Sequence, residues 1–503
     1  MAPLIPIAYI LLAIGSGSGR GRGRSSGRVS GGGRGRGRGN AKTTTGRGRK
    51  RYTRDGIKKK PSTDNNDDNR QEELYPLPPL TKPNGPRPSY YTCRHSYEDT
   101  LLDEIQRYVD SSCDGKVVIT SSPYPGLVRV EDEDSVLPTL YDPVYALQCL
   151  PSCVVITAES IKGLAREVLS ALLGDGIDDD NDATIDKQSE QTRQQLRNAP
   201  RGSLSIHPLV PGMCKGQSNP IMQHRSTKIS EEISKMLKKS YPAARKASIT
   251  TTSDEKDGDI TQSTEERWVL QVMLQSPNIA VASITKSKHI GPGINSYLPN
   301  IQHPLGLAKV DIVERMPSSA YRKLMEGIEC MGIYPTLETT VVDLGACPGG
   351  WSSVIRRYFE SCKVIAVDRS ELDPILMKDD MVEFIKGDAF TYQPPNYEHQ
   401  DYWMISDIIA YPERITELLK QWCSNKWASN MIVTMKFQGN EPDLNESDVA
   451  IQVVKGCGYT CRVKHFFNNK NEVTFMVSSV VENDVRARDL NVGIVGTQMY
   501  PSL

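Results

Sequence analysis

The chain has 503 residues, with 61 basic and 61 acidic side chains that give a net charge of zero. Its length allows two folded domains plus extensions, because domains usually span about 100–200 residues. The balanced total excludes net charge as an argument for a nucleic-acid or membrane partner. The 11 cysteines are too few, in a chain of this length, for a disulfide scaffold, and they favour a reducing compartment.

Residues 1–90 are predicted to be an arm and linker without a packed core. Residues 4–14 are apolar, but a helix that crosses a bilayer needs about 20 such residues, so no stable membrane association is expected. The stretch could be the hydrophobic part of a targeting signal. Residues 19–54 alternate glycine and arginine, which is typical of a disordered arm that binds RNA; a transit peptide is the alternative. The compartment stays open between the nucleus or nucleolus and an organelle such as a plastid or mitochondrion.

Residues 91–300 are predicted to form an α+β domain. Apolar side chains recur at helical spacing over 97–109 and 161–173. Short apolar runs predict strands at 116–120, 127–130, 154–157 and 268–273. The acid-rich run 178–182 is interpreted as a solvated loop, because it lacks the later glycine and the closing glutamate of a calcium loop.

Residues 301–485 alternate strand and helix patterns, and residues 486–503 are a tail. Strand candidates begin at or contain these residues: Val341, Val364, Val382, Tyr402, Met431, Cys461 and Val473. Helical patterns lie between most of them, notably over 412–423 and 444–454. The alternation predicts an α/β fold, a Rossmann-like doubly wound sheet with crossover helices on both faces. Ligands bind such sheets beyond the carboxyl ends of the strands. Four polar residues are expected on that rim: Asp368, Asp388, Asp407 and Lys436.

One turn in this region has the composition of a cofactor site. The apolar strand 341–344 leads into it, and a helical pattern restarts at Trp351. The turn itself is built from small residues: Gly345, Ala346, Gly349 and Gly350. Such a turn lets a ligand approach bare backbone at a helix N-terminus. The next strand ends at Asp368, where an acid can bind both hydroxyls of a ribose. An ordinary strand–helix turn without a ligand is the alternative.

The sequence DLGACPGGWS at 343–352 resembles the first motif of the FtsJ-like (RrmJ-like) ribose 2′-O-methyltransferases. Within that superfamily, residues 403–436 are most similar to the RlmM-type enzymes, which methylate a cytidine ribose of bacterial large-subunit rRNA. The resemblance implies S-adenosyl-L-methionine as cofactor and RNA, in particular rRNA, as substrate. It also implies that residues 91–300 are a THUMP-like RNA-binding domain.

The catalytic Lys-Asp-Lys-Glu tetrad of the family matches four positions of this chain: Lys323, Asp407, Lys436 and Glu472. A ribose hydroxyl is a poor nucleophile until it loses its proton. We therefore expect Lys436 to be the base, with Lys323 close enough to depress its pKa. The two carboxylates would orient the lysines and the ribose. Alternatively both lysines stay charged and stabilise the alkoxide, and which lysine is the base is left open.

The resemblance also assigns cofactor contacts: Asp343, Gly345, Pro348, Gly349, Gly350, Trp351, Asp368, Asp388 and Asp407. Asp343 or the turn backbone would face the methionine end, Asp368 the ribose, and Asp388 the adenine amino group. Asp388 could instead cap a helix. No metal is expected, because the sulfonium leaving group is already activated. The CxxxC pairs Cys149/Cys153 and Cys457/Cys461 lack nearby zinc partners and are interpreted as packed, inert thiols.

Five basic residues of the N-terminal region are candidate RNA phosphate contacts: His207, Lys215, Arg225, Arg245 and Lys246. Basic residues scattered on a solvated surface would look the same. Two other functions stay open. One is a non-catalytic RNA-binding protein with a methyltransferase-like scaffold, and the other is a ribose methyltransferase of tRNA or an mRNA cap. The sequence does not indicate the oligomeric state.

Overall fold

The computed structural model describes twelve stretches of the chain: residues 87–112, 117–121, 124–132, 142–174, 187–210, 219–248, 267–287, 304–306, 310, 312–395, 402–439 and 442–479. Residues 1–86 of the predicted arm, the acid-rich run 178–182, Lys215 and the tail lie outside the described residues, whereas the last residues of the predicted arm enter β1 (Ser89–Thr92). Residues from Pro76 onward cluster as one compact unit. In the described part of the chain, no helix is both long enough and apolar enough to cross a bilayer.

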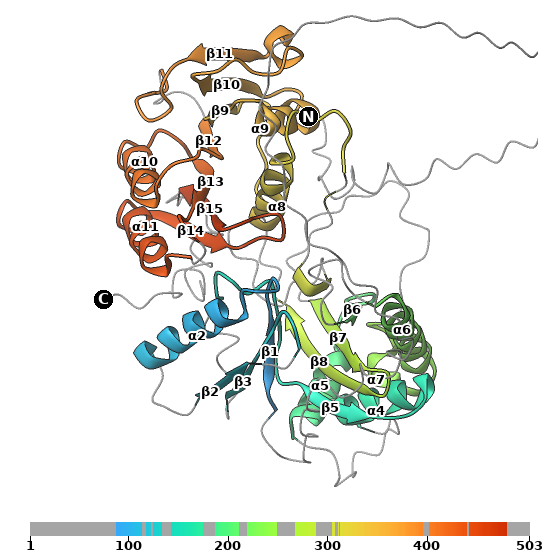
Figure 1. The fold of residues 1–503 in the computed structure, drawn as a ribbon. Coiled ribbons are helices and arrows are strands. Elements are labelled where there is room, and N and C mark those ends of the chain that lie inside the picture. The colour runs from blue at the N-terminus through green and yellow to red at the C-terminus, as the bar shows by residue number, and fades with distance from the viewer. Residues whose placement is uncertain are drawn as a thin grey trace, which may run out of the picture. The chain divides into compact units, whose positions relative to one another are not determined.

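The C-terminal region contains a seven-stranded sheet in the order β11-β10-β9-β12-β13-β15-β14 (Figure 1). Its strands are β9 (Thr340–Leu344), β10 (Lys363–Asp368), β11 (Val382–Lys386), β12 (Tyr402–Ser406), β13 (Asn430–Lys436), β14 (Tyr459–Lys464) and β15 (Glu472–Ser479). The first five in spatial order are parallel, and β15 is antiparallel to both its neighbours. The central strands are buried along their length, which matches their continuous apolar runs. The predicted α/β sheet is confirmed.

Helices cover both faces of this sheet. Figure 1 shows α8 (Tyr321–Met331) and α9 (Gly350–Tyr358) on one side, with α10 (Pro412–Ser424) and α11 (Leu444–Gly456) on the other. The helical patterns expected at 412–423 and 444–454 are thus confirmed. Among the described residues, the crossover from β10 to β11 contains only the short 3₁₀ turn η3 (Leu376–Lys378).

The N-terminal region contains two four-stranded sheets. The first, in the order β2-β3-β1-β4, consists of β1 (Ser89–Thr92), β2 (Val117–Ser121), β3 (Leu127–Asp132) and β4 (Gln148–Leu150). The second, in the order β5-β8-β7-β6, consists of β5 (Val154–Thr157), β6 (Leu204–Leu209), β7 (Arg267–Ser276) and β8 (Ile279–Ser287). The helices of this region are α2 (Glu98–Ser112), α4 (Ile161–Leu173), α5 (Lys187–Arg197), α6 (Pro220–Ser240) and α7 (Pro242–Arg245). Its α+β content agrees with the prediction, while its THUMP-like identity stays a prediction.

The two small sheets have different hydrophobic surroundings. Tyr91 of the first sheet and Leu101 of α2 belong to the same continuous apolar cluster as Val463 of β14. The second sheet has a cluster of its own with α4 and α6. The first sheet and α2 therefore share a core with the seven-stranded sheet, which places their polar side chains close to its loops.

Candidate functional site

The glycine turn between β9 and α9 is tightly packed. Gly345 and Gly349 have φ angles of +74° and +106°, a region that favours glycine. A Cβ added at Gly349 would lie 2.2 Å from the Cδ1 atom of Leu376. At the tip of the turn, Cys347 and Pro348 are exposed. The turn thus needs small residues to close, and it presents its tip to solvent.

Two of the motif residues predicted to contact a cofactor, Asp343 and Trp351, have buried side chains. Asp343 is 1% exposed and accepts a hydrogen bond from the Ser352 hydroxyl at 2.6 Å. Its burial raises the pKa of this carboxyl to about 7, although the Ser352 hydrogen bonds oppose the change. Trp351 is 3% exposed, and its indole N–H donates to the carbonyl of Ala320 at 2.9 Å. Both side chains therefore support the turn from within the core, and their contact with a cofactor stays a prediction.

Two carboxylates follow the carboxyl ends of β10 and β11. Asp368 accepts backbone N–H bonds from Cys347 at 3.0 Å and from Ser370 at 2.8 Å, so it ties the glycine turn to β10. Asp388 accepts from the Phe390 amide at 3.0 Å and from the Arg369 guanidinium at 2.7 Å. The Phe390 hydrogen bond, followed by Arg369, holds the pKa of Asp388 below its usual value. Asp388 closes a turn, and no helix follows it in the described residues 389–395, so the helix-cap alternative is wrong.

The structure brings the four predicted tetrad residues together. The Nζ atom of Lys323 lies 2.6 Å from Asp407 Oδ1 and 3.1 Å from Glu472 Oε1. The Nζ atom of Lys436 lies 3.1 Å from Asp407 Oδ1 and 2.6 Å from the backbone carbonyl of the same residue. Thr434, which the sequence argument missed, also donates to Asp407 Oδ1, at 2.7 Å. Asp407 therefore connects the two lysines.

Strand register explains why these residues meet. Lys436 and Glu472 are direct partners in the antiparallel pair β13–β15, and Asp407 directly follows β12, the other neighbour of β13. Lys323 reaches them from α8, which packs against β13 and β15. Gly327 of α8 lies against the Ile432 side chain, where an added Cβ would come within 3.1 Å. The small residue lets α8 approach the sheet.

The glycine turn adjoins this cluster. An added Cβ at Gly345 would lie 3.0 Å from the side chain of Ile408, the residue after Asp407. Ser406 pairs with Leu344 across β12 and β9, and its hydroxyl donates to the Leu344 carbonyl at 2.9 Å. The turn and the tetrad are therefore neighbours on one rim of the sheet.

The two lysines of the tetrad differ in exposure. The Lys323 side chain is 9% exposed and lies between two carboxylates, whereas that of Lys436 is 22% exposed. Glu472 is buried as deeply as Lys323. A ligand on the rim would therefore meet Lys436 before it met Lys323.

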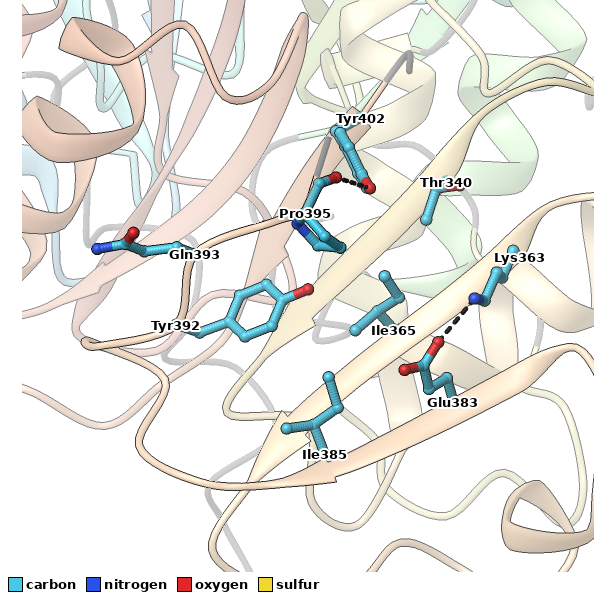
Figure 2. A pocket seen from close by; sticks show the side chains of 9 residues that line it. All are labelled: Thr340, Lys363, Ile365, Glu383, Ile385, Tyr392, Gln393, Pro395 and Tyr402. Carbon is cyan, nitrogen blue, oxygen red and sulfur yellow. Dashed lines mark hydrogen bonds and ion pairs between the residues drawn. The ribbon is translucent and has the colours of Figure 1, made fainter. Parts of the chain in front are cut away.

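A pocket of about 380 Å³ lies elsewhere on the same sheet (Figure 2). It is lined by Thr340, Lys363, Ile365, Glu383, Ile385, Tyr392, Gln393, Pro395 and Tyr402. Thr340, Lys363 and Tyr402 are the first residues of their strands, so the pocket lies at the amino ends, whereas the tetrad lies at the carboxyl ends. It is therefore separate from the candidate site.

The predicted phosphate contacts have mixed surroundings. His207 is 5% exposed within β6, so its role as a phosphate contact is corrected to a core residue. Arg225 donates to the carbonyls of Pro277 at 2.6 Å and Glu159 at 3.0 Å, which is a structural role. Arg245 and Lys246 are exposed beside α7.

The cysteine pairs are thiols within the fold. Cys149, Cys153 and Cys461 are buried, and their burial raises each thiol pKa. Cys457 is partly exposed, 3.3 Å from the Ser424 hydroxyl. Within the described stretches, no three His, Cys, Asp or Glu side chains group in a way that could hold a metal ion.

Comparisons with known proteins identify a family match in the C-terminal region. Residues 316–455 match the model of the FtsJ-like methyltransferases. The ribosomal RNA large subunit methyltransferase M of Shewanella frigidimarina is 28% identical over 222 residues, and that of a Marinomonas species is 28% identical over 188 residues. These alignments cover 42% and 35% of this chain, and 57% and 52% of the two relatives. The chain thus spans little more than half the length of the relatives it matches.

A solved structure of a ribosomal RNA methyltransferase from Plasmodium falciparum is 18% identical, over 32% of this chain and 97% of that one, with a TM-score of 0.23. That score is too low to carry an argument about the fold. The family match and the two relatives confirm the resemblance that the motif at 343–352 predicts.

Proposed function

We propose that the protein is an S-adenosyl-L-methionine-dependent methyltransferase that acts on the ribose 2′-hydroxyl of RNA, with rRNA as its substrate. One observation carries the proposal: two lysines and two carboxylates meet beside a glycine turn on the rim of a methyltransferase-like sheet. The FtsJ-like family match over residues 316–455 and the names of the two relatives support it.

The residues around the turn suit S-adenosyl-L-methionine. The turn is small at Gly345, Gly349 and Gly350, and Pro348 presents its tip. Asp368 ends β10 beside the turn, where its carboxylate can accept further hydrogen bonds from a ribose. We assign Asp388 to the adenine end. When bound, the cofactor supplies a methyl group on a positively charged sulfur, so the site has only to provide an oriented oxygen.

Orientation of the sugar is the task we assign to Asp407 and Lys436. Asp407 Oδ1 accepts from Lys323, Lys436 and Thr434, which leaves Oδ2 to accept from a ribose hydroxyl. Lys436 is the more exposed lysine, and we assign to it the contact with the hydroxyl oxygen and its proton. A fixed cation at this position would stabilise the negative charge that develops on the oxygen.

Lys323 and Glu472 hold this arrangement in place. Lys323 bridges the carboxylates of Asp407 and Glu472, so three elements, α8, β12 and β15, are fixed relative to one another. Such a fixed geometry matters for catalysis, because well-oriented groups reach effective molarities of about 10⁵–10⁸ M.

The RNA itself would be bound mainly outside the tetrad. We propose that the α+β region, predicted at 91–300, is a THUMP-like RNA-binding domain, and that the arginine-glycine arm of residues 1–90 adds sequence-independent contacts. In this division of roles, residues 301–485 carry the chemistry. Arg245 and Lys246 are exposed and remain candidates for phosphate contacts.

The test separates a catalyst from a scaffold. Purified full chain is assayed for S-adenosyl-L-methionine binding by calorimetry and for methyl transfer into rRNA in a single turnover. Lys436→Ala should keep cofactor binding and lose transfer, while the matched control Lys420→Ala, an exposed lysine of α10, should keep both. Cofactor binding without transfer in the unmodified chain would favour an RNA-binding scaffold and overturn the proposal.

A further inference from the structure

The loop that leads to Glu472 is held by residues of the N-terminal region. This loop, residues 465–471, joins β14 to β15. Arg94 and Tyr97 lie between β1 and the first turns of α2, about 370 residues earlier in the chain. The Arg94 guanidinium donates to the Asn469 carbonyl, and the Tyr97 hydroxyl donates to the Lys470 carbonyl at 3.0 Å.

The contact of Arg94 acts on the peptide group that holds Glu472. The Asn469 carbonyl and the Lys470 N–H are the two ends of one planar peptide unit. That N–H donates to Glu472 Oε1 at 3.1 Å. Arg94 therefore fixes the plane of the peptide and, with it, the direction of the N–H that orients the Glu472 carboxylate.

Contacts between aromatic rings reinforce the same loop. The His465 ring lies 4.1 Å from the ring centre of Tyr97 and 5.0 Å from that of Tyr145. His465 is fully buried, which lowers its pKa to about 3, so the ring is neutral at physiological pH. Its Nε2 atom lies 2.8 Å from the Lys470 carbonyl and 3.2 Å from Nη1 of Arg94. The loop is thus held by both aromatic contacts and hydrogen bonds.

A continuous path joins Arg94 to the tetrad. Glu472, oriented by the Lys470 N–H, accepts from Lys323, and Lys323 in turn donates to Asp407. On the other side of the loop, the buried carboxyl of Glu326 in α8 accepts from the Asn468 N–H at 2.9 Å. A shift of the loop would therefore move Glu472 relative to Lys323.

We propose that Arg94, assisted by Tyr97, is a positioning residue for methyl transfer: the N-terminal region completes the catalytic site by fixing the loop that carries Glu472. This inference rests on the proposed function, because it acts through the tetrad. It goes further, because it makes the first small sheet and α2 part of the active enzyme as well as candidates for RNA binding.

The experiment compares Arg94→Ala with Arg107→Ala in the full chain. Arg107 also joins α2 to the C-terminal region, but it contacts Asn445 at 3.0 Å and Asp448 at 2.8 Å in α11. Arg94→Ala should lower the single-turnover rate of methyl transfer about 10- to 100-fold, because small misplacements of catalytic groups cost rate, with cofactor affinity unchanged. Arg107→Ala should stay within about twofold of the unmodified chain. Equal losses in both variants would overturn the proposal.

A double variant distinguishes positioning from general stability. If Arg94 acts through Glu472, Arg94→Ala should add less than about a twofold loss to Glu472→Gln. If the rate loss of the double variant equals the product of the two single-variant losses, the inference is contradicted. Should Arg94→Ala fail to fold, Tyr97→Phe removes only the hydroxyl contact to Lys470 and should lower the rate about threefold to tenfold. An unchanged Tyr97→Phe rate would count against the proposal in that case.

Hydrogen exchange tests the loop without any assay of activity. Amides of residues 465–473 should exchange faster in Arg94→Ala, or in Tyr97→Phe, than in the unmodified chain and in Arg107→Ala. Unchanged exchange would overturn the positioning role even if the protein methylates RNA. If exchange is faster but the unmodified chain transfers no methyl group, the role of Arg94 in fixing the loop is supported and the proposed function is contradicted.

Discussion

Two aspartates of this protein each lie between two cationic side chains, but their surroundings differ. Asp407 lies 2.6 Å from Lys323 and 3.1 Å from Lys436 at the rim of the large sheet. Asp142 accepts from Arg462 at 2.8 Å and from Lys464, both in β14. The chemical groups are nearly the same in the two clusters.

The two clusters differ in how much of their side chains is exposed to solvent. The side chains of Asp142, Arg462 and Lys464 are 6%, 4% and 4% exposed. Lys464 also donates to the carbonyls of Pro143 at 2.6 Å and Ala146 at 3.1 Å, which uses all three of its N–H groups. Burial lowers its pKa, and Asp142 opposes this change.

The cluster of Asp407, Lys323 and Lys436 is the open cluster, because it can still bind a ligand. Lys436 is the most exposed residue of the tetrad. The three donors to Asp407 all contact Oδ1, so Oδ2 can still accept a hydrogen bond from a ligand. A charged triad therefore indicates chemistry only where it has unfilled hydrogen-bonding capacity beside a binding turn. Where every polar group has its hydrogen-bond partners and is buried, the same triad stabilises the fold.

The largest expected effect is on the open cluster. Asp407→Asn keeps the size of the side chain but removes the charge between the two lysines, so methyl transfer should fall about 10³-fold. Single-turnover transfer and urea unfolding measure activity and stability separately. A variant that unfolds easily yet retains transfer when folded would break the comparison, because Asp407 would then resemble Asp142.

The buried cluster of Asp142, Arg462 and Lys464, the sealed cluster, should lose stability on mutation but leave methyl transfer unchanged. Asp142→Asn leaves Arg462 and Lys464 buried without their counter-charge, and breaking such a pair costs about 3–5 kcal/mol of unfolding free energy. Urea unfolding measures this loss, and transfer per folded molecule should be retained. A loss below about 1 kcal/mol would show that the cluster is not sealed in solution.

A buried carboxyl in α8 sharpens the comparison through pH. Burial raises the pKa of Glu326 from 4.5 to about 7. The folded protein therefore keeps a proton that the unfolded chain releases above pH 4.5, so stability falls as the pH rises from about 4.5 to about 7. The difference corresponds to about 3 kcal/mol at 1.4 kcal/mol per pH unit.

Glu326→Gln should remove the contribution of Glu326 to this pH dependence, leaving that of Asp343, whose pKa burial also raises to about 7, while it preserves the acceptor for Asn468. Urea unfolding at several pH values between 4.5 and 8 measures the slope for both proteins. Equal slopes in the variant and the unmodified chain would mean that Glu326 is ionised and solvated in the folded state.

The smallest expected effect concerns the glycine turn of the open site. Gly349→Ala places a Cβ at a φ of +106°, against Leu376, which should cost about 1–2 kcal/mol of stability and weaken cofactor binding. Gly456→Ala, where an added Cβ meets no atom within 4 Å, is the matched control. Calorimetric titration with S-adenosyl-L-methionine measures the affinity. Equal affinities in the two variants would argue against a cofactor at the turn.

The large sheet could be predicted from sequence because its central strands are continuous apolar runs. The rule that ligands bind at carboxyl ends then placed Asp407 and Lys436 on one rim, as observed. Lys323 could be found only through the family resemblance, since it lies in a helix and no strand end marks it. Its buried position and its two carboxylate partners became visible only in three dimensions.

The N-terminal helices were harder to predict. Helix α5 carries one buried apolar side chain, Leu196, and buries the polar Ser189 and Arg193, so its sequence shows no apolar stripe. Helix α6 does have a signal that was missed: Ile229, Ile233 and Leu237 recur every four residues after Asn219, which caps the helix.

Contacts between distant segments were beyond the sequence argument. Asp142 and Arg462 are 320 residues apart, and nothing local in either segment marks the other as its partner. The same holds for Arg94 and the loop before Glu472. The burial of Asp343 and Trp351, and their hydrogen bonds to Ser352 and Ala320, likewise became visible only in the structure.

The identity of the methylated atom tests the central claim most directly. Full chain, S-adenosyl-L-methionine with a labelled methyl group, and rRNA are incubated, and the RNA is digested to nucleosides for mass spectrometry. The account predicts label on the ribose 2′-oxygen, and its loss with Lys436→Ala but not with Lys420→Ala. Label on a base, or label on the ribose that Lys436→Ala leaves unchanged, would contradict it.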